Sequence, residues 1–494
     1  MLSLFALVLA TDHLDRSKPH KPIDLTVGAA KAFHAELLSH ARATEVAHGH
    51  LHPSQPPALV AQRTSSAALY SSSGTIAIDP VDFGADPTGQ KDSSPAFKSA
   101  MNELLNATGL QPPMASGIQD LGGRTLTLGG GVFLISEPLV VPPMYGNLHI
   151  ADGTLRATST FDGSRYLIEV GSGTDCHPVL PSGKPDQQAS CNEFINVQNV
   201  LFDASLVAAG GMLIAQTMGA TVGPAAFFIG FTAVGLKIDK GHEVMLTEAW
   251  LASCYWSDAD CKGSGAASDA IAVQINGNDH YLSNVIVFDF AHVGVEVNGA
   301  ANLLSAVHTW NGGGTGISLG TSASAYGAHQ NRLVGCYLDY NTLDMWDPSD
   351  TLVESTFFLE THARLRAFHG AVTGLIMRFN TYSTSESVVL DGEFKSASGV
   401  RISDETNAAK STRAQRALTA EGATRFAFDF STALLFPSIP LEDIRYTFVE
   451  ARSRAGAPPT FVQHVAHAPN STAVIVDMSQ PVSGTIFMEA AQAI

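Results

Sequence analysis

The sequence predicts an all-β protein: a right-handed parallel β-helix with an N-terminal capping helix and a small C-terminal antiparallel β appendage. Three observations lead to this fold class. Strand, turn and helix signals follow one another at residues 79–105, short apolar runs recur through the middle of the chain, and 44 glycines accompany 45% apolar residues. Such a composition is typical of a turn-rich β protein with a large core.

The first predicted elements are a strand, a turn and a helix. Val81 and Phe83 alternate with polar or small residues as in a short strand, and Asp86-Pro-Thr-Gly has the residues of a turn. Asp92 or Ser93 can cap a following helix. The apolar residues of this helix are Phe97, Met101, Leu104 and Leu105. A helix here would close one end of a stack of strands, whose open edge otherwise favours aggregation.

Apolar runs of strand length recur between residues 285 and 379. One series begins at Val285, Ala306, Cys336, Thr356 and Met377, so its members start 21, 30, 20 and 21 residues apart. A second series lies between them, at Val293-Gly-Val-Glu-Val, Gly316-Ile-Ser-Leu, Leu343-Asp-Met-Trp and Ala363-Arg-Leu-Arg. Two short strands in each period are what a coiled solenoid with several sheets requires. A propeller would need longer four-stranded blades, and the spacing of leucine-rich repeats is absent.

The chain divides into four predicted segments. Residues 1–10 are apolar and end in Ala10, as a secretory signal peptide does, and residues 11–76 have the composition of a leader and linker. Residues 77–400 are the predicted β-helix domain. Residues 401–494 are a β-rich domain, with period-two alternation from Thr424 and further strand-like runs at Ala433-Leu-Leu-Phe-Pro, Ile444-Arg-Tyr-Thr-Phe, Ala473-Val-Ile-Val and Gly484-Thr-Ile-Phe. We expect this domain to cap the β-helix, with carbohydrate binding as the alternative.

The charge balance limits the partners. There are 28 basic and 46 acidic residues, a formal net charge of −18, so binding to nucleic-acid phosphate is not expected. An acidic polysaccharide would also be repelled, and its site would need local Lys, Arg or His, or a bridging cation. Residues 206–236 carry no charge, but their glycines favour buried strands over a membrane span. We expect no membrane partner and a monomer.

The five cysteines fit a secreted protein. Cys176 and Cys191, and likewise Cys254 and Cys261, are close enough in sequence to form disulfides, which leaves Cys336 in an apolar strand. No paired C-x-x-C pattern is present, and a zinc cluster is therefore disfavoured.

A succession of motifs resembles a known family. In chain order they are Asp120-Leu-Gly-Gly-Arg, Gly130-Gly-Val-Phe-Leu-Ile, Gly153-Thr-Leu-Arg-Ala, Cys191-Asn-Glu-Phe, Val200-Leu-Phe-Asp, Lys240-Gly-His-Glu, Asn276-Gly-Asn-Asp, Cys336-Tyr-Leu-Asp-Tyr, Val389-Leu-Asp-Gly-Glu-Phe, Phe428-Asp-Phe-Ser and Leu434-Leu-Phe-Pro. They resemble the quartet-type polygalacturonases, plant enzymes of pollen-tetrad separation. The resemblance implies a pectin-lyase-like β-helix, secretion to the cell wall, and action on or binding to an acidic polysaccharide, pectin-like galacturonan.

The chemistry of glycoside hydrolysis points to pairs of acids. One carboxylic acid must protonate the leaving oxygen, and a second carboxylate must activate water or attack. Residues one coil apart in a β-helix stack at about 4.8 Å, so acids about 20 positions apart can face one groove. Asp269 and Asp289 have this separation and adjoin strands, and we expect them to be the catalytic pair. Asp279, with Asp258 or Asp260, is a second candidate pair.

Further residues are candidates to assist. His308 is a candidate for catalysis, and the candidate substrate-binding residues are His242, Glu243, Asp258, Asp260, His292, Trp310 and Asp339. Each has a structural alternative, because Asp caps turns, an inward His is usually hydrogen-bonded, and aromatic residues usually pack in cores.

The broader family of polygalacturonase hydrolases carries motifs that this chain keeps only in part. Ser268-Asp269 matches the Asn-Thr-Asp strand start, and Asp289 lies near the double-Asp position without its partner. Gly314-Thr-Gly occupies the position of the family's Gly-His-Gly motif, and Leu343-Asp-Met-Trp replaces the basic Arg-Ile-Lys motif. Three functions therefore stay open: a hydrolase without a cofactor, a calcium-dependent pectate lyase-like enzyme, and a catalytically inactive glycan-binding wall protein.

Overall fold

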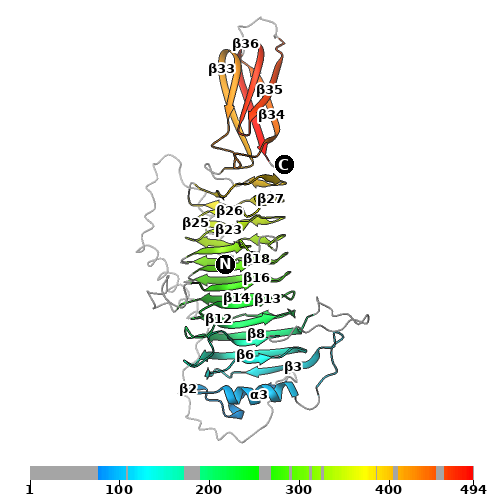
Figure 1. The fold of residues 1–494 in the computed structure, drawn as a ribbon, viewed down its shortest axis with the longest axis vertical. Coiled ribbons are helices and arrows are strands. Elements are labelled where there is room, and N and C mark those ends of the chain that lie inside the picture. Colours follow the sequence, from blue (N-terminus) through cyan, green and yellow to red (C-terminus); the bar gives the residue numbers. More distant parts are fainter. Residues whose placement is uncertain are drawn as a thin grey trace, which may run out of the picture. The chain divides into compact units, whose positions relative to one another are not determined.

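The computed structural model describes residues 76–492, except 107–109, 172–189, 255–268, 289–291, 311–313, 324–327, 385, 404–409 and 452–460. Two large parallel sheets, of twenty and ten strands, run through most of this part of the chain. Figure 1 shows their strands stacked coil upon coil. The protein is therefore a parallel β-helix, and the predicted fold class is confirmed.

The strands of the twenty-stranded sheet are β1 (Ala77–Ile78), β2 (Thr88–Asp92), β3 (Gln119–Thr127), β4 (Val132–Ile135), β6 (Tyr145–Ala157), β8 (Asn192–Asp203), β10 (Thr217–Met218), β11 (Thr221–Val222), β12 (Ala226–Ile229), β14 (Met245–Ala252), β16 (Tyr281–Phe288), β18 (Leu303–Ser305), β19 (His308–Trp310), β21 (Arg332–Val334), β22 (Tyr337–Asp339), β24 (Leu352–Glu354), β25 (Phe357–Leu359), β28 (Ile376–Arg378), β29 (Thr381–Tyr382) and β32 (Arg401–Ser403). The ten-stranded sheet contains β5 (Leu139–Val141), β7 (Tyr166–Val170), β9 (Gly210–Ala215), β13 (Val234–Asp239), β15 (Ile271–Ile275), β17 (Val293–Val297), β20 (Thr315–Leu319), β23 (Leu343–Trp346), β26 (Ala363–Arg366) and β30 (Val388–Asp391). A two-stranded sheet pairs β27 (Ala371–Thr373) with β31 (Ser396–Ser398).

Each coil of the twenty-stranded sheet bends at one residue in the left-handed backbone region. Asn284 (φ 55°), Ala306 (φ 53°) and Ser355 (φ 54°) hold this position in three of the coils. Each bend divides a coil into two halves, so β16 pairs with β18 before the bend and with β19 after it. The prediction that Met377 continues the series of Val285, Ala306, Cys336 and Thr356 is therefore wrong. Met377 belongs to β28, which pairs with β24 before the bend, whereas Thr381 pairs with Phe357 after it.

Side chains stacked from coil to coil fill the interior. Val295 and Val297 of β17 are fully buried, and so are the matching residues of the neighbouring strands. Burial of one such side chain stabilises the fold by about 1.5–3 kcal/mol. A buried polar ladder follows one turn, where the backbone N–H of His280 donates to Asn302 Oδ1 and that of Asn302 to Asn331 Oδ1, each at 2.9 Å. These bonds satisfy backbone groups that the turns would otherwise leave unpaired.

A helix covers the N-terminal coil, as predicted. Helix α3 (Ser94–Asn106) buries Phe97, which contacts the Phe133 ring edge-on at 5.2 Å, and the Asp92 carboxylate accepts a hydrogen bond from the Ser94 backbone N–H. The expected strand at Val81 and Phe83 is wrong. This segment is the 3-10 helix η1 (Pro80–Phe83), because the Asp79 side chain caps it and proline lacks an N–H for strand pairing.

The C-terminal part is an antiparallel sheet of β33 (Arg413–Asp429), β34 (Leu441–Glu450), β35 (His464–Asn470) and β36 (Ala473–Gln492). The predicted strand at 433–437 is wrong, because this segment turns toward the β-helix instead. Phe436 is fully buried in the β-helix core and contacts the ring of Phe394 at 5.9 Å. The buried amide of Gln492 donates to the carbonyls of Phe436 and Ile439 at 2.6 and 2.7 Å. The tail thus supplies apolar side chains to the last coils of the β-helix.

Residues 206–236 form strands β9 to β13, as expected. In the described part of the chain, no helix has the length and apolar character to cross a membrane. Cys336 is a buried free cysteine, whereas Cys176 and Cys261 lie outside the described residues. The two disulfide pairings stay predictions.

Candidate functional site

The outer side of the ten-stranded sheet carries a concentration of polar and charged side chains. Side chains alternate along a strand, so Glu296 points outward between the inward Val295 and Val297. Register pairing places the equivalent residues of the neighbouring strands beside it. We call these outward residues the polar face; they are Lys237, Asp239, Gln274, Asn276, Glu296, Asn298, Ser318, Asp344, Arg364, Arg366 and Asp391.

A chain of amide and carboxylate groups runs across one half of the polar face. Oε1 of the buried Glu296 accepts hydrogen bonds from Gln274 Nε2 at 2.8 Å and from Asn298 Nδ2 at 2.7 Å. Asn298 also donates to Asn276 Oδ1 at 3.0 Å, and Asn276 to Asp239 Oδ1 at 3.3 Å. The network fixes the orientation of Glu296, so this carboxylate is held rigidly at the surface of the sheet.

Two arginines and one buried aspartate dominate the other half. Arg364 Nε lies 3.1 Å from Asp344 Oδ1, and Arg366 Nε lies 2.7 Å from Asp344 Oδ2. The Asp344 side chain is 3% exposed, against 28% for Arg364 and 24% for Arg366. Arg366 also lies 5.0 Å from the centre of the Trp346 ring and 3.4 Å from the Asp391 carboxylate. This cluster is a group of two arginines and two aspartates held together on the polar face.

Asp269 and His292 lie at the edge of the polar face where the strands begin. Asp269 is exposed and lies two residues before the start of β15. The backbone N–H of His292 donates to the Ala270 carbonyl at 3.2 Å, so His292 occupies the next coil at the same edge. Thr315, one coil further on, donates through its hydroxyl to Asp344 Oδ2 at 3.2 Å. Thr315 thus links this edge to Asp344, while register pairing places Arg364 level with Gln274, in the interior of the polar face. Asp289, Asp258 and Asp260 lie outside the described residues.

His242, Glu243 and Asp279 lie at the opposite edge, where β13 and β15 end. Nδ1 of His242 is 3.5 Å from Asp279 Oδ2, so the structure brings these two predicted residues together. Glu243 has a buried carboxylate oxygen without a hydrogen bond among the described residues. The five residues of β15 separate Asp279 from Asp269 by about 16 Å along the strand. The predicted residues therefore flank the polar face and do not converge on one point.

His280 lies buried beneath this second edge. Its Nδ1 accepts a hydrogen bond from the Val244 backbone N–H at 3.1 Å, while its Nε2 has no partner among the described residues. Burial, and secondarily the nearby His242, lowers the pKa of His280 to about 4. His280 is therefore neutral at physiological pH and serves as a structural acceptor.

His308, Trp310 and Asp339 belong to the other large sheet. His308 Nε2 lies 3.9 Å from Asp339 Oδ2, and the His308 ring stacks on Tyr337 at 4.4 Å. Burial raises the pKa of Asp339 and lowers that of His308, because it disfavours the charged form of each group. His308 and Asp339, predicted separately as a catalytic and a substrate-binding residue, therefore lie close together, on the second halves of the twenty-stranded coils and not on the polar face.

The sequence analysis missed the residues that make up most of the polar face. The pattern of Ala363-Arg-Leu-Arg indicates only a strand, and the motif comparison stops one coil earlier, where Leu343-Asp-Met-Trp replaces the basic residues. A usable signal was present, since charges at alternate positions within an apolar strand must point outward together. The same signal marks Glu296 in Val293-Gly-Val-Glu-Val.

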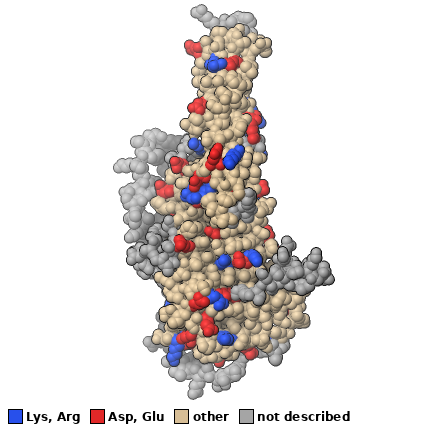
Figure 2. Space-filling view, in the orientation of Figure 1, with Lys and Arg blue, Asp and Glu red and all other residues tan. Residues whose placement is uncertain are grey.

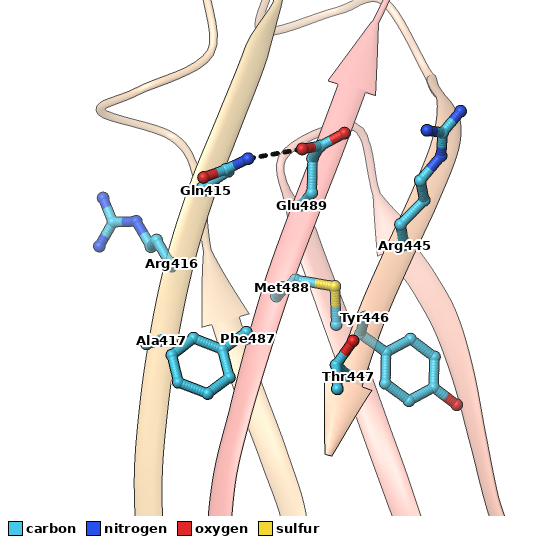
Figure 3. Close-up of a pocket in the computed structure, with 9 residues that line it drawn as sticks. All are labelled: Gln415, Arg416, Ala417, Arg445, Tyr446, Thr447, Phe487, Met488 and Glu489. Carbon is cyan, nitrogen blue, oxygen red and sulfur yellow. Dashed lines mark hydrogen bonds between the residues drawn. The ribbon is translucent and has the colours of Figure 1, made fainter. Parts of the chain in front are cut away.

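A hollow of about 450 Å³ lies on the C-terminal sheet and not on the polar face. Figure 3 shows the side chains that line it. The Gln415 amide on β33 donates a hydrogen bond to the Glu489 carboxylate on the neighbouring strand β36, and Phe487 lies beside Ala417. No predicted site residue lines it. Figure 2 shows acidic and basic side chains mixed in small groups over the visible face, without one large patch of either sign. In the described part of the chain, no group of three or more His, Cys, Asp or Glu side chains is placed to hold a metal.

Comparison with known proteins identifies the family. No protein-family model matches the sequence. Over 430 residues the chain is 31% identical to Polygalacturonase QRT3 of Arabidopsis thaliana, covering 84% of each protein.

Solved structures with a similar fold are more distant. The A-module of mannuronan C-5 epimerase AlgE4 of Azotobacter vinelandii matches 66% of this chain and 98% of its own, with 9% identity and a TM-score of 0.41. A hyperthermoactive exopolygalacturonase of Thermotoga maritima matches 67% of this chain and 90% of its own, with 12% identity and a TM-score of 0.35. Likeness at this level carries no argument about function. The sequence identity over most of both proteins does, and it shows that the chain belongs to the quartet-type polygalacturonase family.

Proposed function

We propose that the protein hydrolyses glycosidic bonds in pectin-like galacturonan on the polar face. The observation that carries the proposal is the Arg364 and Arg366 pair around Asp344, on the outward face of the sheet whose edge Asp269 adjoins. The name of its relative, Polygalacturonase QRT3, supports the same chemistry.

The arginine cluster answers the problem that the net charge of −18 sets for a polyanionic substrate. Asp344 and Asp391 balance the charges of the two arginines, so the cluster offers guanidinium donors to a carboxylate and no net positive charge. The forked N–H groups of arginine match the geometry of a carboxylate, and the Asp344 contacts hold the forks in place before a ligand arrives. A uronate carboxylate would bind at the exposed side of the two arginines.

Asp269 and Asp289 are the proposed acid and base. Asp269 is exposed at the edge of the polar face, and the contact between Ala270 and His292 places the following coil beside it. Asp289 precedes His292 by three residues in the sequence. Hydrolysis needs two carboxyl groups on either side of the bond, and their separation decides between inversion and retention. His292 is the proposed neighbour of this pair, in contact with the substrate.

The distance between acid and arginines sets the length of substrate. β15 and β26 are four interstrand steps apart in the sheet, about 19 Å. A sugar bound by the arginines therefore lies several units from the bond at Asp269. The amide network around Glu296 lies between them and offers hydrogen-bonding groups to sugar hydroxyls.

The remaining parts of the proposal concern location and covalent structure. We propose that residues 1–10 direct secretion to the cell wall, that residues 11–76 form a leader, and that Cys176–Cys191 and Cys254–Cys261 form disulfides. These rest on the composition of the N-terminus and on cysteine spacing. The β-helix at 77–400 and the β-rich domain at 401–494 are the proposed domains of a monomer.

Product analysis tests the proposed reaction. Full-length protein is incubated with polygalacturonate, with and without a calcium chelator, and both reducing ends and unsaturated sugars are measured. The proposal expects new reducing ends, no unsaturated product and no effect of the chelator. An unsaturated product that chelator abolishes would show a lyase instead, and the absence of any product would contradict catalysis.

A further inference from the structure

One uncharged row of side chains crosses the second halves of the twenty-stranded coils. Register pairing joins its members directly, each to the next: Phe227, Trp250, Ile286, His308, Tyr337 and Phe357. We call them the aromatic row. Their side chains alternate with fully buried residues such as Phe228 and Leu338, so the row points away from the core.

Several rings of the row are exposed. Trp250 is 46% exposed, Phe227 38% and Phe357 36%. The rings also contact one another, since Tyr337 lies 4.4 Å from His308 and 5.2 Å from Phe357. Contiguous exposed apolar side chains on a soluble protein mark a binding surface more often than isolated ones do.

A second line of aromatic residues widens the row. Phe288 lies 5.8 Å from Trp250, and Trp310 lies 6.3 Å from Phe288. From Phe227 to Phe357 the row crosses five interstrand steps, about 24 Å. The result is a strip of aromatic side chains in which His308 and Tyr337 stack face to face, with the more exposed rings of Trp250, Phe227 and Phe357 on either side of them.

Buried polar groups lie beside the rings. Asp339 is 8% exposed, and its Oδ1 has no hydrogen bond among the described residues; the same holds for His308 Nε2. A buried polar group without a partner destabilises the free protein, so a ligand hydroxyl that reaches His308 or Asp339 after a small side-chain movement is favoured. This observation is independent of the exposed rings and also points to a ligand with hydroxyl groups.

We propose that the aromatic row binds a neutral polysaccharide built of pyranose rings. A pyranose presents an apolar C–H face and a polar rim, so its face stacks on an aromatic ring while its hydroxyls meet groups such as His308 and Asp339. The repeat of one ring for each coil suits a linear polymer of similar units. The row holds no Lys or Arg, and the carboxyl group of Asp339 lies next to it, so an acidic polymer fits the polar face and a neutral one fits this row.

The inference goes beyond the proposed function. It concerns another sheet, another class of glycan and no bond cleavage. In a wall where both glycans occur, binding to the neutral polymer would hold the polar face near its galacturonan substrate.

Binding of neutral hexasaccharides to the full-length protein tests the inference. The probes are hexamers with cello-, xylo-, manno- and galacto-type backbones, and binding is measured by calorimetry. We expect at least one to bind, and Trp250→Ala and Phe357→Ala each to weaken it roughly fivefold to tenfold. Trp250→Tyr keeps a flat ring and should bind like the wild type, whereas Trp250→Leu keeps only the apolar surface and should bind like Trp250→Ala. Phe487→Ala, at an exposed ring on the C-terminal sheet, is the matched control and should change nothing.

Three results would overturn the inference. They are the absence of binding to every hexamer, binding by Trp250→Leu equal to the wild type, and a wild-type dimer that Trp250→Ala converts to monomer in sedimentation, which would make a second copy of the chain the occupant. The proposed hydrolysis is measured separately on soluble polygalacturonate. A failure to hydrolyse polygalacturonate would therefore not count against the aromatic row as a binding site. A failure to bind the hexamers would likewise not count against hydrolysis.

Discussion

Arg366 Nε lies 2.7 Å from Oδ2 of Asp344, and the two residues come from adjacent coils of the ten-stranded sheet. Because Asp344 is almost fully buried, the ion pair lies in an environment of low dielectric constant. Removing one partner would leave the other charge unpaired and would lower the free energy of unfolding. The same aspartate also contacts Arg364. One buried anion thus sets the positions of two cations that are proposed to bind substrate.

Replacing Arg366 tests this role. Arg366→Ala should raise KM for polygalacturonate by about tenfold or more with a smaller change in kcat, because a binding contact and not a reacting group is lost. Arg366→Lys should recover only part of the affinity, since lysine lacks the forked donor. The control is Arg378→Ala, which breaks an exposed ion pair with Glu354 on the other sheet. An unchanged KM in Arg366→Ala would contradict the assignment.

Substitution of the acids separates the two edges of the polar face. Asp269→Asn should lower kcat by about 10²–10⁴, the usual contribution of an acid or base. Asp279→Asn, at the opposite edge, removes a partner of His242 and should lower kcat less than about tenfold, because it touches no reacting atom. Initial rates at saturating polygalacturonate measure both. A larger loss of kcat in Asp279→Asn than in Asp269→Asn would show that the reaction takes place at the edge where His242 and Asp279 lie.

Substrate length should matter. The separation of about 19 Å between the strands of Asp269 and the arginines means that a short oligomer cut at Asp269 cannot also reach Arg364. We expect kcat/KM to rise steeply from galacturonate trimer to hexamer in the wild type and to rise much less in an Arg364→Ala, Arg366→Ala double variant. Equal kcat/KM values for all lengths in the wild type would show that the arginines do not bind the substrate.

His280 should make stability depend on pH. Its pKa falls from the ordinary 6.5 to about 4 in the folded protein because it is buried. The unfolded chain therefore binds the proton first, so stability is complete above pH 6.5 and falls as pH drops from 6.5 toward 4, by roughly 3 kcal/mol for the full shift. His280→Asn retains an acceptor for the Val244 N–H and should flatten this part of the curve. Urea unfolding at several pH values measures it, and an identical slope in the variant would contradict the account.

Phe436 should stabilise the C-terminal end of the β-helix. Phe436→Ala removes a fully buried ring from the core and should lower the free energy of unfolding by about 3–5 kcal/mol. Phe461→Ala, at a ring that is 87% exposed, is the control and should have almost no effect. Equal thermal unfolding of both variants would show that the tail does not close the core.

The fold could be predicted because its signals are local and repeated. Short apolar runs at regular intervals give the coils, and residues 92–105 give both the cap and the buried face of α3. Two errors show the limit of such signals. Val81 and Phe83 alternate as in a strand, yet the capping aspartate and Pro80 produce a helical turn. Ala433 to Pro437 is apolar like a strand, yet it fills the core of a domain that begins more than three hundred residues earlier.

The site was harder to predict because spacing along the chain does not say which edge of a sheet a residue occupies. Asp269 and Asp279 are ten positions apart and lie at opposite ends of one strand. The number of residues in each turn varies, so a motif position such as Leu343-Asp-Met-Trp does not reveal that two arginines lie one coil later, at Arg364 and Arg366. Residue type indicates candidate chemistry, while the register of the coils decides which groups meet.

The position of bound substrate tests the central claim most directly. A crystal structure of the Asp269→Asn variant with a galacturonate hexamer should show the sugar along β15 to β26, with one uronate carboxylate at Arg364 and Arg366 and a glycosidic oxygen beside residue 269. A hexamer lying over the aromatic row, or in the hollow around Phe487, would contradict it.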